Sequence, residues 1–89
     1  MAWRIEFGSD AKKDLARLDA PVARRITAFL RERVATSNDP RSLGQALKGS
    51  SLGELWKYRV GHWRIIASIE DGAVRVLVVR IDNRREVYR

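Results

Sequence analysis

The sequence predicts one α+β domain in which a pair of antiparallel helices covers one face of a mainly antiparallel sheet. Three observations support it. Apolar residues alternate with polar ones at the start of the chain, recur at helical spacing over residues 11–34, and alternate again over residues 55–81. A chain of 89 residues is of single-domain size. We therefore expect residues 1–89 to form one domain: an N-terminal strand, a helical hairpin and a three-stranded antiparallel meander.

The N-terminal part predicts a strand that leads into a helix. In residues 3–7, WRIEF, apolar side chains alternate with Arg4 and Glu6, which indicates a half-buried strand. Residues 8–10, Gly-Ser-Asp, end that strand and offer oxygens that can cap a helix. The apolar side chains of the first helix then recur at helical spacing, at Ala11, Leu15 and Leu18.

A short joint at residues 19–21 separates the first helix from a second one. Pro21 suits the first turn of the second helix, because the N–H that proline lacks has no partner within a first turn. One apolar stripe follows, formed by Val22, Ile26, Phe29, Leu30 and Val34. Because the joint is short, the two helices should run antiparallel.

Residues 36–54 form the longest stretch without a periodic pattern. Pro40 and three glycines interrupt it, so we expect a long connection with one helical turn over residues 43–47. Long loops in compact domains are often functional.

The remainder predicts a meander of three strands. LWKYRV, residues 55–60, runs to a tight turn at Gly61-His62. WRIIASI, residues 63–69, runs to a second turn at residues 70–72. AVRVLVVRI, residues 73–81, is the most apolar segment and should lie centrally. The tail, DNRREVYR, is polar and basic.

Cationic residues alternate with apolar ones in the first two strands of the meander. Because successive side chains point to opposite faces, the aromatic-rich sets should face the helices: Trp56, Tyr58, Val60, Trp63, Ile65, Ala67 and Ile69. Lys57, Arg59 and Arg64 then share the uncovered face, on strands about 4.8 Å apart, where they can converge on one anion. Alternatively, they are ordinary charged residues of a solvent-exposed face.

The charge balance favours a polyanionic partner. Eighteen Lys and Arg against eleven Asp and Glu give a formal net charge of +7, which is typical of domains that contact phosphate backbones. A basic domain balanced by an acidic protein partner is the alternative. No apolar run approaches the ~20 residues that a membrane span needs, and the N-terminus shows no signal peptide. We therefore expect no membrane contact and a cytoplasmic location.

The residue inventory excludes most catalytic chemistries. One histidine and no cysteine offer no zinc cluster, and scattered carboxylates indicate no two-metal nuclease, so we expect neither metal nor cofactor. Cation-promoted phosphoryl chemistry remains, or binding alone. Lys57, His62 or Tyr88 can transfer a proton, whereas Arg59 is a poor base because its guanidinium stays protonated.

Four segments together resemble the RelE/ParE superfamily of bacterial type II toxins, and most of all its RelE-like mRNA interferases. They are KKDLARL at 12–18, LKGS at 47–50, LWKYRVGHWRII at 55–66 and DNRREVYR at 82–89. The resemblance implies a toxin that enters the ribosomal A site and cuts mRNA without a metal ion. The 2′-hydroxyl attacks the neighbouring phosphate, which leaves a cyclic phosphate and a 5′-hydroxyl end.

The same resemblance assigns roles on the two strands. Lys57 and Arg59 match the two basic residues of the family's second strand, and Arg64 matches its phosphate-gripping arginine. Arg59 stands where the best-matching pattern has lysine, which shifts the role of general base toward Lys57 or Tyr88. His62 matches no catalytic position and is expected to be an exposed turn residue.

The tail completes the implied catalytic set. Arg84 best matches the tail arginine, with Arg85 as the alternative and as a further RNA contact. Tyr88 matches the tyrosine that stacks on the substrate base and assists proton transfer; the chain stops one residue later, without the C-terminal helix of some members.

The superfamily also implies a partner and an alternative activity. The expected partner is an acidic antitoxin with an extended segment that wraps the toxin. ParE-like members share the fold but inhibit DNA gyrase, and a catalytically inactive binding member is a third reading. Having Lys57, Arg59, Arg64 and Tyr88 together favours the RelE side.

Overall fold

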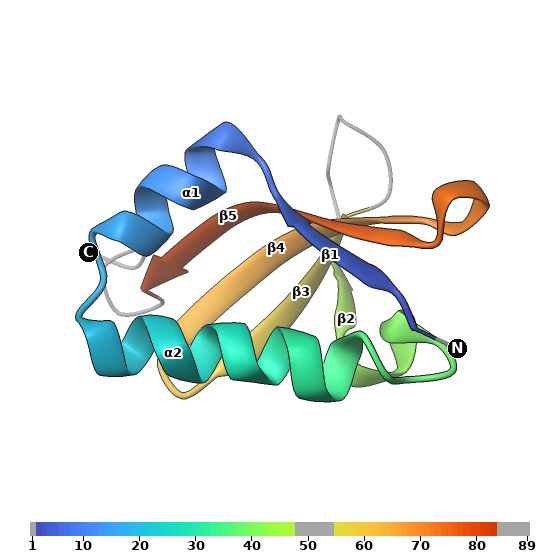
Figure 1. Ribbon diagram of the computed structural model, residues 1–89, viewed down its shortest axis with the longest axis horizontal. Coiled ribbons are helices and arrows are strands. Elements are labelled where there is room, and N and C mark those ends of the chain that lie inside the picture. The colour runs from blue at the N-terminus through green and yellow to red at the C-terminus, as the bar shows by residue number, and fades with distance from the viewer. Residues whose placement is uncertain (1, 48–54, 84–89) are drawn as a thin grey trace.

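The structure is a computed structural model that describes residues 2–47 and 55–83. Two successive helices and one mixed sheet make up these residues (Figure 1), which confirms the predicted α+β class. In chain order the elements are β1 (Arg4–Phe7), α1 (Ser9–Ala16), α2 (Ala20–Phe29) followed by a π-helical turn (Leu30–Val34), a 3₁₀ turn (Pro40–Leu43), β2 (Gln45–Leu47), β3 (Leu55–Val60), β4 (Trp63–Glu70), a second 3₁₀ turn (Asp71–Ala73) and β5 (Arg75–Asn83). Among these residues, no helix has the length and apolar character needed to cross a membrane.

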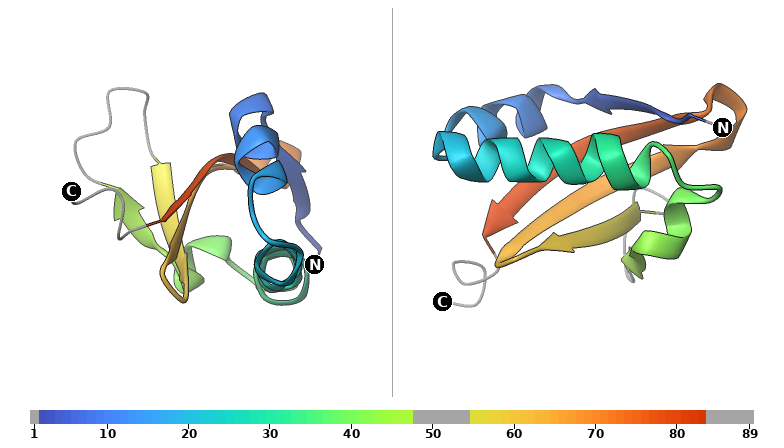
Figure 2. Two further views of the ribbon diagram at one scale, coloured as in Figure 1. Left: turned by 90° about the vertical axis from the view of Figure 1, so that its left-hand side faces the viewer. Right: turned by 60° about the horizontal axis from the view of Figure 1, so that its bottom comes forward.

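The sheet confirms the predicted meander and adds a strand on each side of it. The strands lie in the order β1-β5-β4-β3-β2, with β3, β4 and β5 paired antiparallel in succession. The N-terminal strand β1 pairs parallel with β5, which places the apolar β5 inside the sheet. Both helices lie on one side of the sheet, and the chain reverses direction between them (Figure 2).

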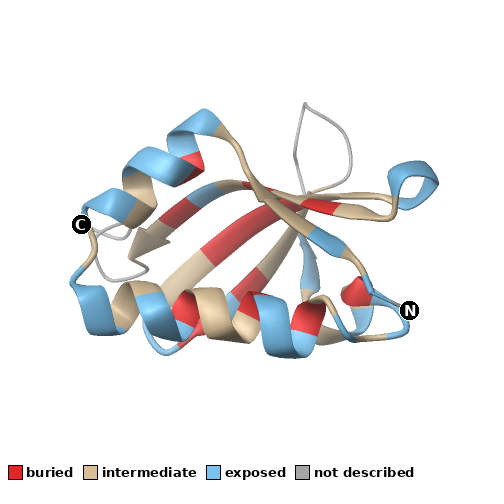
Figure 3. Cartoon of the chain, viewed as in Figure 1, coloured by how far each residue is buried: buried red, intermediate tan, exposed pale blue. Residues whose placement is uncertain are grey.

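The core lies between the helices and the sheet (Figure 3). The apolar stripe of the second helix is confirmed, since Ile26, Leu30 and Val34 are fully buried. They share the core cluster with Tyr58, Val60, Ile65, Ala67, Val76, Val78 and Ile81 from the strands. Pro21 lies in the first turn of α2, as expected. Burial of these side chains against the sheet fixes the helical layer over β3, β4 and β5.

The connection between the helices and the meander is more ordered than expected. The prediction of a helical turn over residues 43–47 was wrong. A 3₁₀ turn precedes Gly44, and the short strand β2 follows it. At Gly44 the chain passes so close to β3 that a Cβ atom would lie 2.8 Å from the Lys57 carbonyl oxygen. The buried Tyr58 hydroxyl also donates to the Pro40 carbonyl oxygen at 2.8 Å. Pairing with β3, which local sequence does not reveal, therefore decides the conformation here.

Trp56 does not pack under the helices, which corrects a second expectation. It lies two residues before Tyr58 on β3 and so shares its face, yet it lies outside the core cluster. The Arg41 guanidinium lies 5.8 Å from the centre of its ring. Arg41 also donates to both carboxylate oxygens of Asp71, at 3.1 and 2.6 Å, in the turn between β4 and β5. Arg41, rather than a helix, therefore lies against the Trp56 ring.

Asp14 of α1 holds the end of β5. Strand β1 pairs with β5 only as far as Val78, so the later residues of β5 need another acceptor on that edge. The Asp14 carboxylate accepts from the Ile81 N–H and from Arg80, both at 2.9 Å. Burial raises the pKa of Asp14, but these bonds and the Arg80 charge outweigh it and the pKa is lowered. The carboxylate therefore stays ionised and anchors the part of β5 that carries Asp82.

Candidate functional site

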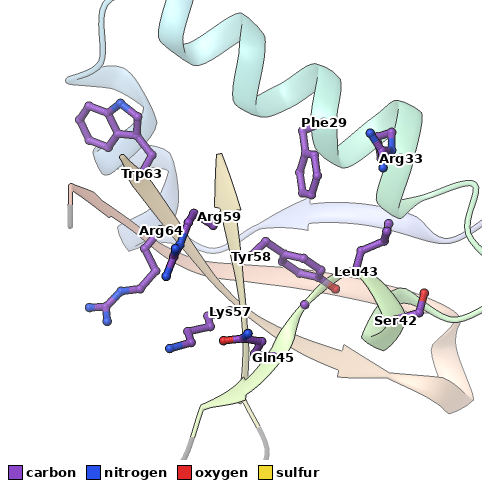
Figure 4. Close-up of a pocket in the computed structure, with 11 residues that line it drawn as sticks. Phe29, Arg33, Ser42, Leu43, Gln45, Lys57, Tyr58, Arg59, Trp63 and Arg64 are labelled. Atoms are coloured by element: carbon purple, nitrogen blue, oxygen red, sulfur yellow. The ribbon is translucent and has the colours of Figure 1, made fainter. Parts of the chain in front are cut away.

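A cleft of about 420 Å³ lies beside β3 and gathers the three predicted strand cations. Its walls come from the end of α2 and the π-helical turn after it, from residues 42–45, and from the hairpin of β3 and β4. Lys57, Arg59 and Arg64 project along one side of this β3 cleft, and Phe29 and Arg33 approach from the other (Figure 4). We call Lys57, Arg59 and Arg64 the cationic cluster.

Strand alternation and one tight turn bring the cationic cluster together. Lys57 and Arg59 are two residues apart on β3 and so share a face. Gly61 adopts φ +61° in the turn, a conformation that glycine reaches without strain. The turn sets a register that places Arg59 directly opposite Arg64. His62 is exposed in the same turn, as predicted, and does not line the β3 cleft.

Arg64 is more enclosed than the sequence suggested. Its side chain is 25% exposed, and its Nε and Nη2 donate to the two carboxylate oxygens of Asp82, each at 3.1 Å. The expectation of an exposed Arg64 was therefore wrong, because Asp82 lies opposite it on β5. Lys57 is half-buried and Arg59 is exposed.

Two aromatic side chains, Phe29 and Tyr58, form part of the lining of the β3 cleft. The rings of Phe29 and Tyr58 meet edge to face with centroids 5.9 Å apart. Burial, together with the charge of Asp39, raises the pKa of Tyr58 to about 12, although Arg41 opposes this. A phenol with this pKa, donating to the Pro40 carbonyl oxygen, stays protonated at neutral pH. Tyr58 therefore supports the cleft and is not a candidate proton carrier.

The structure adds Arg33 and Asp82 to the residues predicted for this region. Arg33 lines the β3 cleft four residues after Phe29, so helical spacing could have placed the two side chains together. Asp82 faces Arg64, but its position depends on the register of β4 and β5. The alternation of the last strand alone did not reveal that register.

The tail residues of the predicted set, Arg84, Arg85 and Tyr88, lie outside the described residues. Within residues 2–47 and 55–83, no group of three or more His, Cys, Asp or Glu side chains is placed to hold a metal ion. The functional groups that the described residues bring to the β3 cleft are mainly cations. Such groups can bind an anion and stabilise charge that develops on it.

Comparison with known proteins gives a consistent picture. A family model described as the ParE toxin of the type II toxin–antitoxin system parDE matches residues 5–88. The toxin RelE of Mycobacterium tuberculosis (strain ATCC 25618 / H37Rv) is 30% identical over 87 residues, which cover 98% of this chain and 87% of the relative. Toxin RelG of the same organism is 26% identical over 89 residues, which cover 100% of this chain and 99% of the relative.

Solved structures share the fold. The toxin–antitoxin complex RelBE2 of M. tuberculosis contains a chain that matches with a TM-score of 0.83 at 23% identity, over 94% of this chain and 93% of that chain. A mutant of the E. coli toxin RelE in the free state matches with a TM-score of 0.75 at 26% identity, over 99% of this chain and 92% of that chain.

Proposed function

The chain belongs to the RelE/ParE family of type II toxins, and from this premise we propose that it is a ribosome-dependent, metal-independent endoribonuclease that cuts mRNA in the ribosomal A site. The observation that carries the proposal is the cationic cluster, in which Lys57, Arg59 and Arg64 meet at one cleft. The names of the curated relatives, RelE and RelG, agree with it.

The cationic cluster suits transfer of a phosphoryl group within RNA. The 2′-hydroxyl oxygen would bond to phosphorus while the bond from phosphorus to the 5′-oxygen breaks, so negative charge builds up on the phosphate oxygens. Arg59 and Arg64 can donate paired hydrogen bonds to those oxygens, and Lys57 can act as a point charge. Removing one such donor from a preorganised site typically costs about 10²–10³ in rate.

Two proton transfers complete the proposed reaction. One proton leaves the 2′-hydroxyl and one reaches the departing 5′-oxygen, which becomes a hydroxyl. Lys57 and Tyr88 are the proposed carriers, because a guanidinium such as that of Arg59 is a poor base and His62 does not line the β3 cleft. Arg84, or Arg85, is proposed to add a further contact to the phosphate. Without a strong base, binding geometry must supply much of the rate, up to roughly 7–11 kcal/mol in favourable cases. We propose that the ribosome supplies that geometry by holding the mRNA.

Exposed cations on and beside the helices support the proposal that the partner is RNA. Seven arginines and lysines of α1, α2 and the residues that follow them are exposed: Lys12, Lys13, Arg17, Arg24, Arg25, Arg31 and Arg33. None of the salt bridges within the described ranges neutralises them. A protein with cations on its helices and on its sheet can be embedded in a polyanion on more than one side.

An antitoxin is the second proposed partner. Type II toxins are held inactive by an antitoxin protein, and a chain of net charge +7 suits an acidic one. We propose that an extended acidic segment covers the β3 cleft, since blocking the cationic cluster would keep RNA away from it. A location in the cytoplasm, where ribosomes and mRNA are found, forms part of the same proposal.

Inhibition of DNA gyrase is the alternative that a specific finding favours, because the matching family model is described as a ParE toxin. One experiment separates the two activities. Purified toxin is added to ribosomes programmed with a defined mRNA and, separately, to gyrase with relaxed plasmid. We expect cutting in the A-site codon and unchanged supercoiling. Inhibited supercoiling with intact mRNA would replace the proposed function with the gyrase alternative, and binding without either effect would indicate an inactive member.

A further inference from the structure

We propose that Asp82 is a positioning residue of the site: it holds the Arg64 guanidinium in the plane and place at which Arg64 meets the scissile phosphate. This inference rests on the proposed function. It addresses why a cleft suited to RNA has a carboxylate directly beside its cationic cluster.

Two arginines and one aspartate lie side by side in one row across three strands of the sheet. Arg59 of β3 pairs with Arg64 of β4, and Arg64 pairs with Asp82 of β5. Like charges directly opposite each other on neighbouring strands repel. Asp82 offsets that repulsion from the other side, so Arg64 can stay beside Arg59 before any substrate arrives.

The bond geometry fixes orientation as well as position. The two Asp82 oxygens accept from Nε and Nη2 of Arg64, each at 3.1 Å, which defines the plane of the guanidinium. Asp82 engages two of the five N–H groups that an arginine carries. The side chains of Arg64 and Asp82 are only 25% and 28% exposed, so the pair is partly shielded from water.

A β-bulge creates this pairing. Near the turn between β4 and β5, Glu70 pairs with Arg75 and Ser68 with Leu77. If this register continued along both strands, Arg64 would lie opposite Ile81. The bulge between Ile66 and Ala67 shifts the register by one residue, so that Arg64 meets Asp82. Bulges often re-aim side chains near active sites.

The backbone beside Asp82 is anchored to α1. The residue before it, Ile81, is 3% exposed and its N–H donates to the Asp14 carboxylate at 2.9 Å. Both Asp82 oxygens are occupied by Arg64, which makes a direct role as general base less suitable than a positioning role. A carboxylate here also repels RNA, so its benefit must come from the geometry that it imposes on Arg64.

A double-mutant cycle tests the inference. Asp82→Ala, Arg64→Ala and the double variant are compared with wild type in single-turnover cutting of A-site mRNA. We expect Asp82→Ala to lower the rate by up to about 10²-fold, with unchanged or tighter RNA binding, and to have no further effect in the Arg64→Ala background. Asp82→Glu should restore part of the rate. The matched control is Asp71→Ala, which breaks a second bidentate pair, with Arg41; neither residue lines the β3 cleft, so this variant should keep the wild-type rate.

Three results would overturn the inference. An Asp82→Ala variant that is folded and fully active would remove Asp82 from the site. Equal rate losses in the wild-type and Arg64→Ala backgrounds would mean that Asp82 acts directly, as a base. A faster reaction would mean that Asp82 only shields Arg64 from RNA. If Asp82→Ala does not fold, Asp82→Asn takes its place in the cycle. The NMR signal of the Arg64 Nε–H then reports on the pair, because it should move and broaden when the pair is lost.

The same cycle measured as growth arrest separates this inference from the proposed function. Growth arrest reports loss of toxicity whatever the target. If wild type arrests growth without cutting mRNA, the proposed ribonuclease is wrong, while the cycle on growth arrest still decides whether Asp82 acts through Arg64.

Discussion

Arg59 and Arg64 lie directly opposite each other on β3 and β4 and face the same cleft. Two guanidinium groups at paired positions repel each other, so this arrangement lowers stability unless an anion joins them. Asp82 compensates part of the charge in the free protein. Lys57 lines the same cleft, and we propose that the cationic cluster binds a phosphate of RNA.

Replacing Arg64 should separate activity from stability. We expect Arg64→Ala to lower single-turnover cutting of A-site mRNA by about 10²–10³-fold, because it removes a donor to the charged transition state. The Asp82 side chain is only 28% exposed and would lose its partner, so the free energy of unfolding should fall by about 1–3 kcal/mol. Urea unfolding and the cutting rate, measured on one preparation, check both values.

The control for Arg64→Ala is Arg4→Ala. Arg4 lies on β1 at the other edge of the sheet, its side chain is 64% exposed, and it does not line the β3 cleft. Arg75 is less suitable, because it bonds to Glu6 and Glu70 across β1, β4 and β5. A folded Arg64→Ala variant that is as toxic as Arg4→Ala would show that the cationic cluster is not the active site.

Gly44→Ala should damage both the fold and the site. The new methyl group would lie 2.8 Å from the Lys57 carbonyl oxygen and 3.0 Å from the Tyr58 ring, so β2 must move away from β3. We expect a loss of about 1–3 kcal/mol in unfolding free energy and a lower cutting rate, because Lys57 shifts. Gly72→Ala has nothing within 4 Å of its new Cβ and serves as the control. Equal stability of the two variants would contradict the close approach at Gly44.

Tyr58 should make stability depend on alkaline pH. Its pKa is raised to about 12 in the folded protein, mainly by burial, against an unfolded value of about 10. The stabilisation is thus complete below pH 10 and is lost as pH rises from 10 to 12, since the unfolded chain ionises first. Two pKa units correspond to roughly 2–3 kcal/mol. Urea unfolding at pH 9 and pH 11.5 measures the loss, and Tyr58→Phe should show a smaller pH dependence. A Phe variant with the same alkaline loss would assign it to other groups.

Tyr88 should reveal its role through two substitutions. If its ring only stacks on a base, Tyr88→Phe keeps most of the cutting rate, because stacking is worth about 1–3 kcal/mol and needs no hydroxyl. If its hydroxyl transfers a proton, Tyr88→Phe loses nearly as much rate as Tyr88→Ala. Single-turnover rates across a pH series distinguish the two cases. Wild-type rates in both variants would remove Tyr88 from the mechanism.

The sequence was sufficient to predict the meander and the strand face that carries the cationic cluster. Lys57 and Arg59 alternate with core residues such as Tyr58, and the tight turn at Gly61 leaves one register for Arg64. Period-two alternation and a two-residue turn are local signals, so the cationic cluster could be predicted from them.

Features that depend on contacts between distant segments were missed. Strand β2 has three residues, too few for a periodic pattern, and forms because Gly44 lets it approach β3. The pair of Arg64 with Asp82 needs the bulge between Ile66 and Ala67, which no turn or alternation signal marks. Trp56 resembles a core residue in sequence, but the helical layer does not reach it and Arg41 covers it instead.

The most direct test of the account uses ribosomes that hold one of two mRNAs in the A site. The mRNAs are identical except that the second has a 2′-deoxy nucleotide at the cut position. Purified toxin should cut the all-ribose mRNA and leave a 2′,3′-cyclic phosphate and a 5′-hydroxyl end, because the 2′-oxygen is the proposed nucleophile and the cationic cluster stabilises the charge that forms. The 2′-deoxy mRNA should remain intact. Cutting of the 2′-deoxy mRNA at the same rate, or no cutting of either mRNA while gyrase is inhibited, would contradict the account.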